Sequence, residues 1–108
     1  QGFFLDGIND WVDLGPSLAF DLADLTLEAW VHITPATNIG DRRVIGRDDL
    51  GAGGPRQLYV LKSSVGECGS GKPGFTILKG GMLTTACSPG ALSAGFHHLA
   101  GVRSGQTV

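Results

Sequence analysis

The chain has 108 residues, of which 8 are basic and 10 acidic, so it has the size of one domain and a nearly balanced charge. A protein that tracks a nucleic-acid backbone carries an excess of Lys and Arg, and nucleic acid is therefore excluded as a partner. No apolar run reaches the roughly 18 residues of a membrane-spanning helix, which excludes membrane insertion.

The beginning of the chain predicts short strands and turns. Apolar runs at 2–5 and 10–14 are separated by an Asp-Gly turn signal, and Gly15-Pro16 follows them. Ser17–Asp24 could form one helical turn at most. The chain starts at Gln1 without an initiator Met, so we expect its natural start to have been removed by processing or to lie outside this stretch.

The clearest element is a strand over 25–34. Its residues alternate between two sets, and a period of two over ten residues indicates a β-strand with one buried face. The set predicted to face the core is Leu25, Leu27, Ala29, Val31 and Ile33. The set predicted to face solvent is Thr26, Glu28, Trp30, His32 and Thr34.

The rest of the chain continues in the same manner. Glycine-rich turns separate short apolar segments, and no segment shows sustained helical periodicity. This pattern is typical of an all-β fold, an antiparallel sandwich or barrel, built as one domain over residues 1–108. The further strands are predicted at 42–47, 56–62, 74–79, 83–87 and 96–103.

Cys68 and Cys87 are the two cysteines, and they flank a predicted hairpin formed by 74–79 and 83–87. A bridge between them is geometrically plausible and is the favoured interpretation over two free thiols. One pair is compatible with an oxidising compartment without proving it.

Several motifs imitate active sites without the required context. Gly69-x-Gly71-x-x-Gly74 fits the dinucleotide pattern, but a strand follows where a helix is needed. His97 and His98 are adjacent on one strand, face opposite sides and cannot chelate one ion together. Packing under a loop or over the core is the favoured role of Trp30 and, less strongly, of Trp11. Trp11 is kept as the candidate for stacking on a ligand such as a sugar ring.

The order of the blocks FFLDGINDWVDLG, DLTLEAWVHI, RRVIGR, RQLYV and AGFHHLAGVRSGQTV resembles the laminin-G-like and concanavalin A-like jelly-roll lectin superfamily, including the pentraxins. The resemblance implies an antiparallel β-sandwich of jelly-roll type. Family domains usually continue with several more strands beyond the equivalent of Val108. The resemblance therefore implies that the chain matches the N-terminal part of such a domain, or that a partner supplies the other strands.

The resemblance implies binding rather than catalysis. Glycosidases of this superfamily carry a Glu-x-Asp-x-Glu type cluster, which is absent from a chain whose only glutamates are Glu28 and Glu67. Pentraxin-like members hold Ca²⁺ in the loop that here contains Asp48 and Asp49. Those two carboxylates are candidate calcium ligands, and the alternative is an acidic turn paired with Arg47 or Arg56.

The sequence thus predicts a non-catalytic, secreted or cell-surface module whose ligand is most simply a carbohydrate, bound through loops at one end of the sandwich. The alternative is a protein-interaction or adhesion module within a larger surface polypeptide. At the C-terminal end, Gln106-Thr107-Val108 resembles the start of a return strand after the Ser104-Gly105 turn. An open sheet edge at 96–103 would invite pairing with another chain, so we expect a homo-oligomer, most simply a two-fold dimer. The alternative is that the eight predicted strands close into a compact minimal sandwich that needs no partner.

Overall fold

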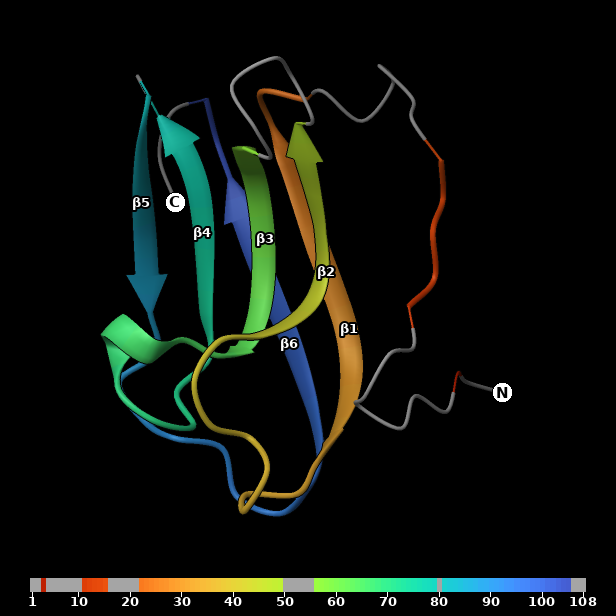
Figure 1. Cartoon of the computed structure of the whole chain (residues 1–108), viewed down its shortest axis with the longest axis vertical. Coiled ribbons are helices and arrows are strands. Elements are labelled where there is room, and N and C mark those ends of the chain that lie inside the picture. The colour runs from red at the N-terminus through yellow and green to blue at the C-terminus, as the bar shows by residue number, and fades with distance from the viewer. Residues whose placement is uncertain (1–2, 4–10, 16–21, 50–55, 80, 106–108) are drawn as a thin grey trace.

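The computed structural model describes residues 3, 11–15, 22–49, 56–79 and 81–105, with the backbone alone for 48–49, 56–58 and 79 (Figure 1). Within these ranges the chain is all-β, with six strands and one turn of 3-10 helix, η2, at Gly66–Cys68. The strands are β1 (Leu25–Ile33), β2 (Arg42–Asp49), β3 (Arg56–Ser64), β4 (Gly74–Lys79), β5 (Met82–Cys87) and β6 (Gly95–Arg103).

The strands form two antiparallel sheets. β1 pairs with β6 along its whole length, from Leu25 opposite Arg103 to Ile33 opposite Gly95. The larger sheet has the order β2-β3-β4-β5. Figure 1 shows β6 running diagonally behind β3 and β4, whereas β5 lies at the outer edge of the larger sheet. The prediction of an antiparallel two-layer arrangement is confirmed, and the finer jelly-roll assignment stays a prediction.

The period-two pattern of β1 produces the expected division into faces. Exposure alternates along the strand, from half-buried Leu25 and Leu27 to buried Ile33, with exposed Thr26, Glu28 and Trp30 between them. The inner face of β1 packs at the border of a small core between the sheets. That core consists of Tyr59, Leu61, Phe75, Ile77 and Leu99.

A glycine permits the closest approach of the two sheets. A Cβ atom on Gly101 of β6 would lie 2.5 Å from Cγ of Phe75 on β4. Real Cβ atoms do not approach carbon so closely, so any other residue at this position would push the sheets apart or move the Phe75 ring. The packing of β6 over β4 therefore depends on the absence of a side chain at position 101.

Three expectations for the N-terminal part need comment. The predicted strand 10–14 is wrong for residues 11–14, which belong to no strand, because a strand requires a ladder partner and none of the described strands pairs with this run. Residues 22–24 of the single helical turn expected at Ser17–Asp24 are not helical. The remainder of that segment, nearly all of the strand at 2–5, and 106–108 lie outside the described residues.

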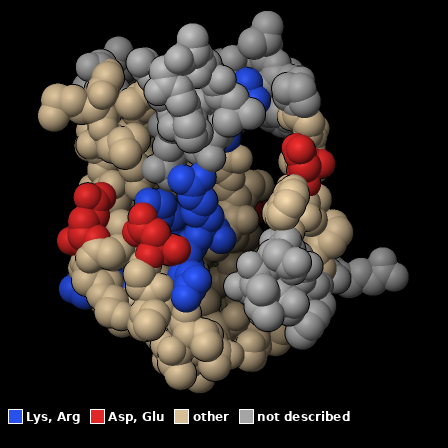
Figure 2. Space-filling view, viewed as in Figure 1, with Lys and Arg blue, Asp and Glu red and all other residues tan. Residues whose placement is uncertain are grey.

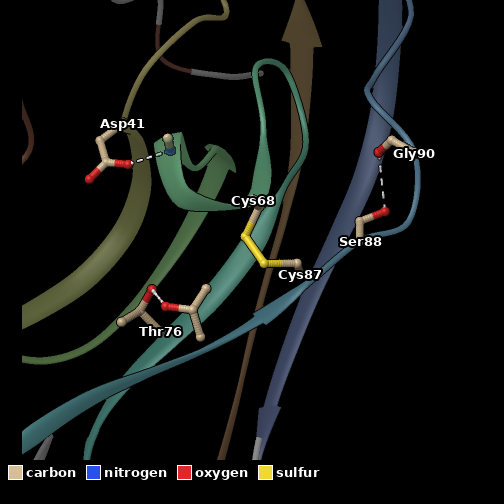
Figure 3. Close-up of a disulfide and its surroundings, with 8 residues drawn as sticks. Asp41, Cys68, Thr76, Cys87, Ser88 and Gly90 are labelled. Atoms are coloured by element: carbon tan, nitrogen blue, oxygen red, sulfur yellow. Dashed lines mark hydrogen bonds between the residues drawn. A yellow bond between two sulfur atoms is a disulfide. The ribbon is translucent and has the colours of Figure 1, made fainter.

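The predicted disulfide joins Cys68 of η2 to Cys87, the last residue of β5 (Figure 3). The Cα atoms are 5.6 Å apart, and the bridge attaches the loop after β3 to the end of an edge strand. A side-chain hydrogen bond of 2.9 Å between Thr76 and Thr85 links β4 to β5 nearby. The sequence signal of two cysteines flanking one hairpin thus identified the pairing correctly.

Asp41 ties the loop before β2 to the end of β3. Its carboxylate accepts a hydrogen bond of 2.9 Å from the Gly66 N–H and pairs with Nζ of buried Lys62 at 3.1 Å. On the face of the molecule that Figure 2 shows, basic side chains gather in the middle and an acidic side chain lies against them. The Gly66 hydrogen bond, followed by the Lys62 hydrogen bond, lowers the pKa of Asp41 below its usual value of 3.8.

This lowered pKa predicts a pH-dependent contribution to stability. A carboxyl whose pKa is lower in the folded state stabilises the fold above its unfolded pKa, and that contribution is lost as the pH falls through the folded pKa. We expect Asp41→Asn to be less stable than the parent chain at pH 7, and the difference to shrink as the pH falls below about 4. Urea melts across this range measure the difference. Glu67→Gln removes an exposed carboxylate nearby and serves as the control; a constant Asp41→Asn difference down to pH 2 would contradict the assignment.

Candidate ligand-binding site

An unusual surface lies on the side of the β1–β6 sheet that points away from the core. The register places Trp30 opposite His98 and His32 opposite Phe96, so four rings from two strands share one face. We call these four residues the aromatic face. Neighbouring strands lie about 4.8 Å apart and alternate residues of one strand about 6.8 Å apart, so the four rings form one compact patch.

The rings contact each other across the two strands. The centroids of Trp30 and His98 are 5.2 Å apart with the ring planes tilted by 44°. His32 and Phe96 form an edge-to-face pair with a centroid distance of 4.9 Å. Such cross-strand aromatic pairs stabilise a two-stranded sheet and hold the rings in fixed orientations.

The larger rings are nevertheless open to solvent. Trp30 and Phe96 are each 73% exposed, although large apolar residues in contact are usually buried or used in binding. The prediction that Trp30 packs into the fold is therefore wrong. The reason is the alternation of β1 itself, because the inner face takes Ala29 and Val31 and leaves Trp30 outside.

Polar atoms border the rings on one side. His98 Nε2 lies 3.5 Å from a carboxylate oxygen of Glu28, which precedes Trp30 by two residues on the same face of β1. Both side chains are partly exposed, so their remaining hydrogen-bonding capacity points to solvent. The face thus combines flat apolar surfaces with hydrogen-bonding groups at its edge.

The two adjacent histidines separate as expected. His98 belongs to the aromatic face, whereas His97 is half-buried on the other side of β6. His97 Nε2 lies 3.1 Å from the carbonyl oxygen of Ser93, in the loop before the strand. No group of three or more His, Cys, Asp or Glu side chains that could hold a metal ion occurs within the described part of the chain.

The other predicted site residues lie elsewhere. Trp11 is 77% exposed, in the segment 11–15 that belongs to no strand. Asp48 and Asp49 were expected in a loop, but their backbone forms the last two residues of β2, because the ladder with β3 continues to Asp49 opposite Arg56. Their side chains fall outside the described residues, so the choice between a calcium site and an acidic turn stays a prediction.

The aromatic face could have been anticipated only in part. Trp30 and His32 were already on the predicted polar set of β1, and Phe96 and His98 alternate along β6 in the same way. What joins the two pairs is the antiparallel register of β1 with β6, two strands that lie far apart in the sequence. Comparison of the chain with protein-family models, curated proteins and solved structures finds no match.

Proposed function

We propose that the chain is a non-catalytic, extracellular binding module and that it binds carbohydrate on the aromatic face. The observation that carries the proposal is the pair of large rings, Trp30 and Phe96, each 73% exposed on one rigid sheet face. The apolar C–H face of a pyranose ring stacks on such aromatic surfaces, while its hydroxyl groups need donors and acceptors at the rim. His98 and Glu28 supply those groups beside Trp30.

One further feature supports the assignment to a binding module outside the cell. The Cys68–Cys87 disulfide is compatible with an oxidising compartment. None of the helical structure among the described residues is long or apolar enough to cross a membrane. The carboxylate arrangement of a glycosidase is also not evident, since Glu28 and Glu67 are the only glutamates and Glu67 lies in the η2 turn.

We expect Trp30→Ala to weaken oligosaccharide binding by about tenfold or more, because it removes the largest stacking surface of the face. Binding to a panel of neutral oligosaccharides on a glycan array, followed by titration of the best ligand, measures the effect. Trp11→Ala is the matched control, since Trp11 is equally exposed but lies outside the sheet. A loss with Trp11→Ala and none with Trp30→Ala would move the site to the segment 11–15.

The same array, run with Ca²⁺ and with chelator, examines the calcium prediction for Asp48 and Asp49. If they hold Ca²⁺, chelation lowers the melting temperature, added Ca²⁺ restores it, and Asp48→Asn abolishes the response. A melting temperature indifferent to chelator and Ca²⁺ would remove this site. An array without any hits, with or without Ca²⁺, would favour the second candidate function, a protein-interaction module.

A further inference from the structure

A cleft of about 430 Å³ lies along β6, and one of its lining residues, His98, also belongs to the aromatic face. One wall is β6, and the other side is formed by the ends of β4 and β5 next to the disulfide. Its lining consists of Leu61, Pro73, Gly74, Phe75, Ala86, Cys87, Ser88, and the unbroken run 98–102.

The β6 wall is a backbone edge rather than a side-chain surface. Five consecutive residues of β6 border the cleft, although their side chains alternate between exposed His98 and Ala100 and buried Leu99 and Gly101. Side chains on both faces of β6 therefore belong to residues that border the cleft. This means that the edge of the strand, rather than one of its faces, is turned toward the cleft. Among the described strands β6 pairs with β1 alone, so the N–H and C=O groups of its other edge point toward the cleft.

The floor of the cleft belongs to a part of the larger sheet that none of the other described strands covers. Ala86 of β5 is directly opposite Phe75 of β4 and shares its inner face, yet Ala86 is exposed while Phe75 is 4% exposed. Thr84 is likewise exposed beside Ile77, which is fully buried. Because β6 packs against β3 and β4, the inner face of β5 extends past it as an open shelf.

The chemistry of the lining restricts what could bind there. Among the described residues, no Lys, Arg, Asp or Glu borders the cleft, and the described polar side chains that line it are those of Ser88 and His98. Three of the lining residues, Gly74, Ala86 and Ala100, are small, and Ala86 lies opposite Phe75 in the ladder of β4 with β5. A ligand must therefore offer backbone-like donors and acceptors to β6 and bulky apolar groups to the shelf.

We propose that this cleft binds an extended segment of another polypeptide, which adds a strand to the free edge of β6 and covers the inner face of β5. An extended peptide presents N–H and C=O groups at the repeat that a strand edge requires, and every second side chain points to the same face. The segment that fits is uncharged at its central positions and carries bulky apolar residues at alternate positions.

A second copy of this chain is a poorer occupant. Joining two β6 edges in an antiparallel manner needs a two-fold axis normal to the sheet, which places the larger sheets of both copies in the same layer. In that layer β5 already extends beyond β6, so the β4–β5 hairpins of the two copies would meet. A single strand avoids this collision, because it brings no second layer with it.

Synthetic peptides test the proposal on the intact chain. The probe is an acetylated and amidated peptide of about seven residues with the sequence Lys-Val-Thr-Val-Thr-Val-Lys, long enough to span the β6 wall at about 3.4 Å per residue. Two further peptides carry N-methyl groups, one on the valines and one on the threonines. In an added strand, alternate amides face β6, so one methylated set loses binding by about tenfold or more and the other is little affected.

Binding is followed by peptide-induced shifts in the amide spectrum of the isotope-labelled chain. We expect shifts at His98 to Val102 and at Ala86, and slowed hydrogen exchange of the β6 amides that face the cleft. On the protein, Ala86→Arg places a long side chain over the shelf and weakens binding by about tenfold. Leu83→Arg lies on the same strand but on its other, exposed face, and it leaves binding unchanged.

Specific outcomes would overturn the proposal. Equal losses with both N-methylated peptides would mean an apolar contact without strand addition. Absence of shifts at about 1 mM peptide would mean that the cleft takes no such ligand. Contacts from 106–108 to β6 in the free chain, or a dimer in sedimentation that buries β6, would mean that the edge is already occupied.

Discussion

Replacing Cys68 and Cys87 together by alanine is expected to lower the free energy of unfolding by about 3 kcal/mol. The bridge closes a loop with a sequence separation of 19 residues, and cross-links of that length restrict the unfolded chain by about this amount. The folded chain also depends on the bridge, because it fastens the η2 loop to the end of an edge strand that lacks a covering layer. Urea denaturation of the parent and the double variant measures the difference.

The control for this prediction is chemical reduction. Reductant should bring the parent chain to the stability of the double alanine variant and should leave that variant unaffected. A double variant within about 0.5 kcal/mol of the parent would contradict the prediction and would indicate that the reduced loop stays ordered without the bridge. Binding to the β6 cleft should also weaken, since Cys87 forms part of its lining.

The success of the cysteine prediction illustrates what local sequence patterns carry. The hairpin of β4 and β5 is a short-range feature, with two apolar runs joined through Gly80-Gly81, and cysteines that flank a hairpin are brought together by the turn itself. The strands at 25–34, 42–47, 56–62 and 96–103 follow equally from alternation and turn residues. Their observed ends differ by one or two residues because ladders continue or stop where partners do.

Local patterns fail where a property depends on a distant partner. The run at 11–14 is apolar enough for a strand, but strand formation also needs a neighbour, and the sequence does not display one. The aromatic face depends on Trp30 meeting His98 through a register between the two ends of the domain. Only the pairing of β1 with β6 turns two separate ring pairs into one surface, and without that pairing the sequence offers Trp11 as its candidate ligand-binding residue.

The burial of polar side chains in the loops could not be predicted from the sequence either. Asn38 is buried and makes two hydrogen bonds with Ser63, donating from Nδ2 to the carbonyl oxygen and accepting from the hydroxyl group. An Asn before a basic strand normally indicates an exposed turn. Its burial follows from the position of the 34–41 loop against the end of β3, which Asp41 also holds in place.

The close approach of the two sheets makes Gly101 the most sensitive glycine for core packing. We expect Gly101→Ala to lower the free energy of unfolding by about 2–3 kcal/mol, because the added Cβ would overlap the ring of Phe75. Thermal and urea melts measure this loss. Gly90→Ala is the matched control, since a Cβ atom there meets no other atom within 4 Å, and its effect should be small.

A second substitution separates steric overlap from backbone effects. Phe75→Leu removes part of the ring that a residue at position 101 would strike, at a cost of its own of about 1–2 kcal/mol for the lost packing. If overlap with Phe75 is the cause, the double variant Gly101→Ala with Phe75→Leu is more stable than the sum of the two single losses predicts. Strict additivity would place the cost in the conformation of β6 instead, and the proposed dependence of sheet packing on Gly101 would then be wrong.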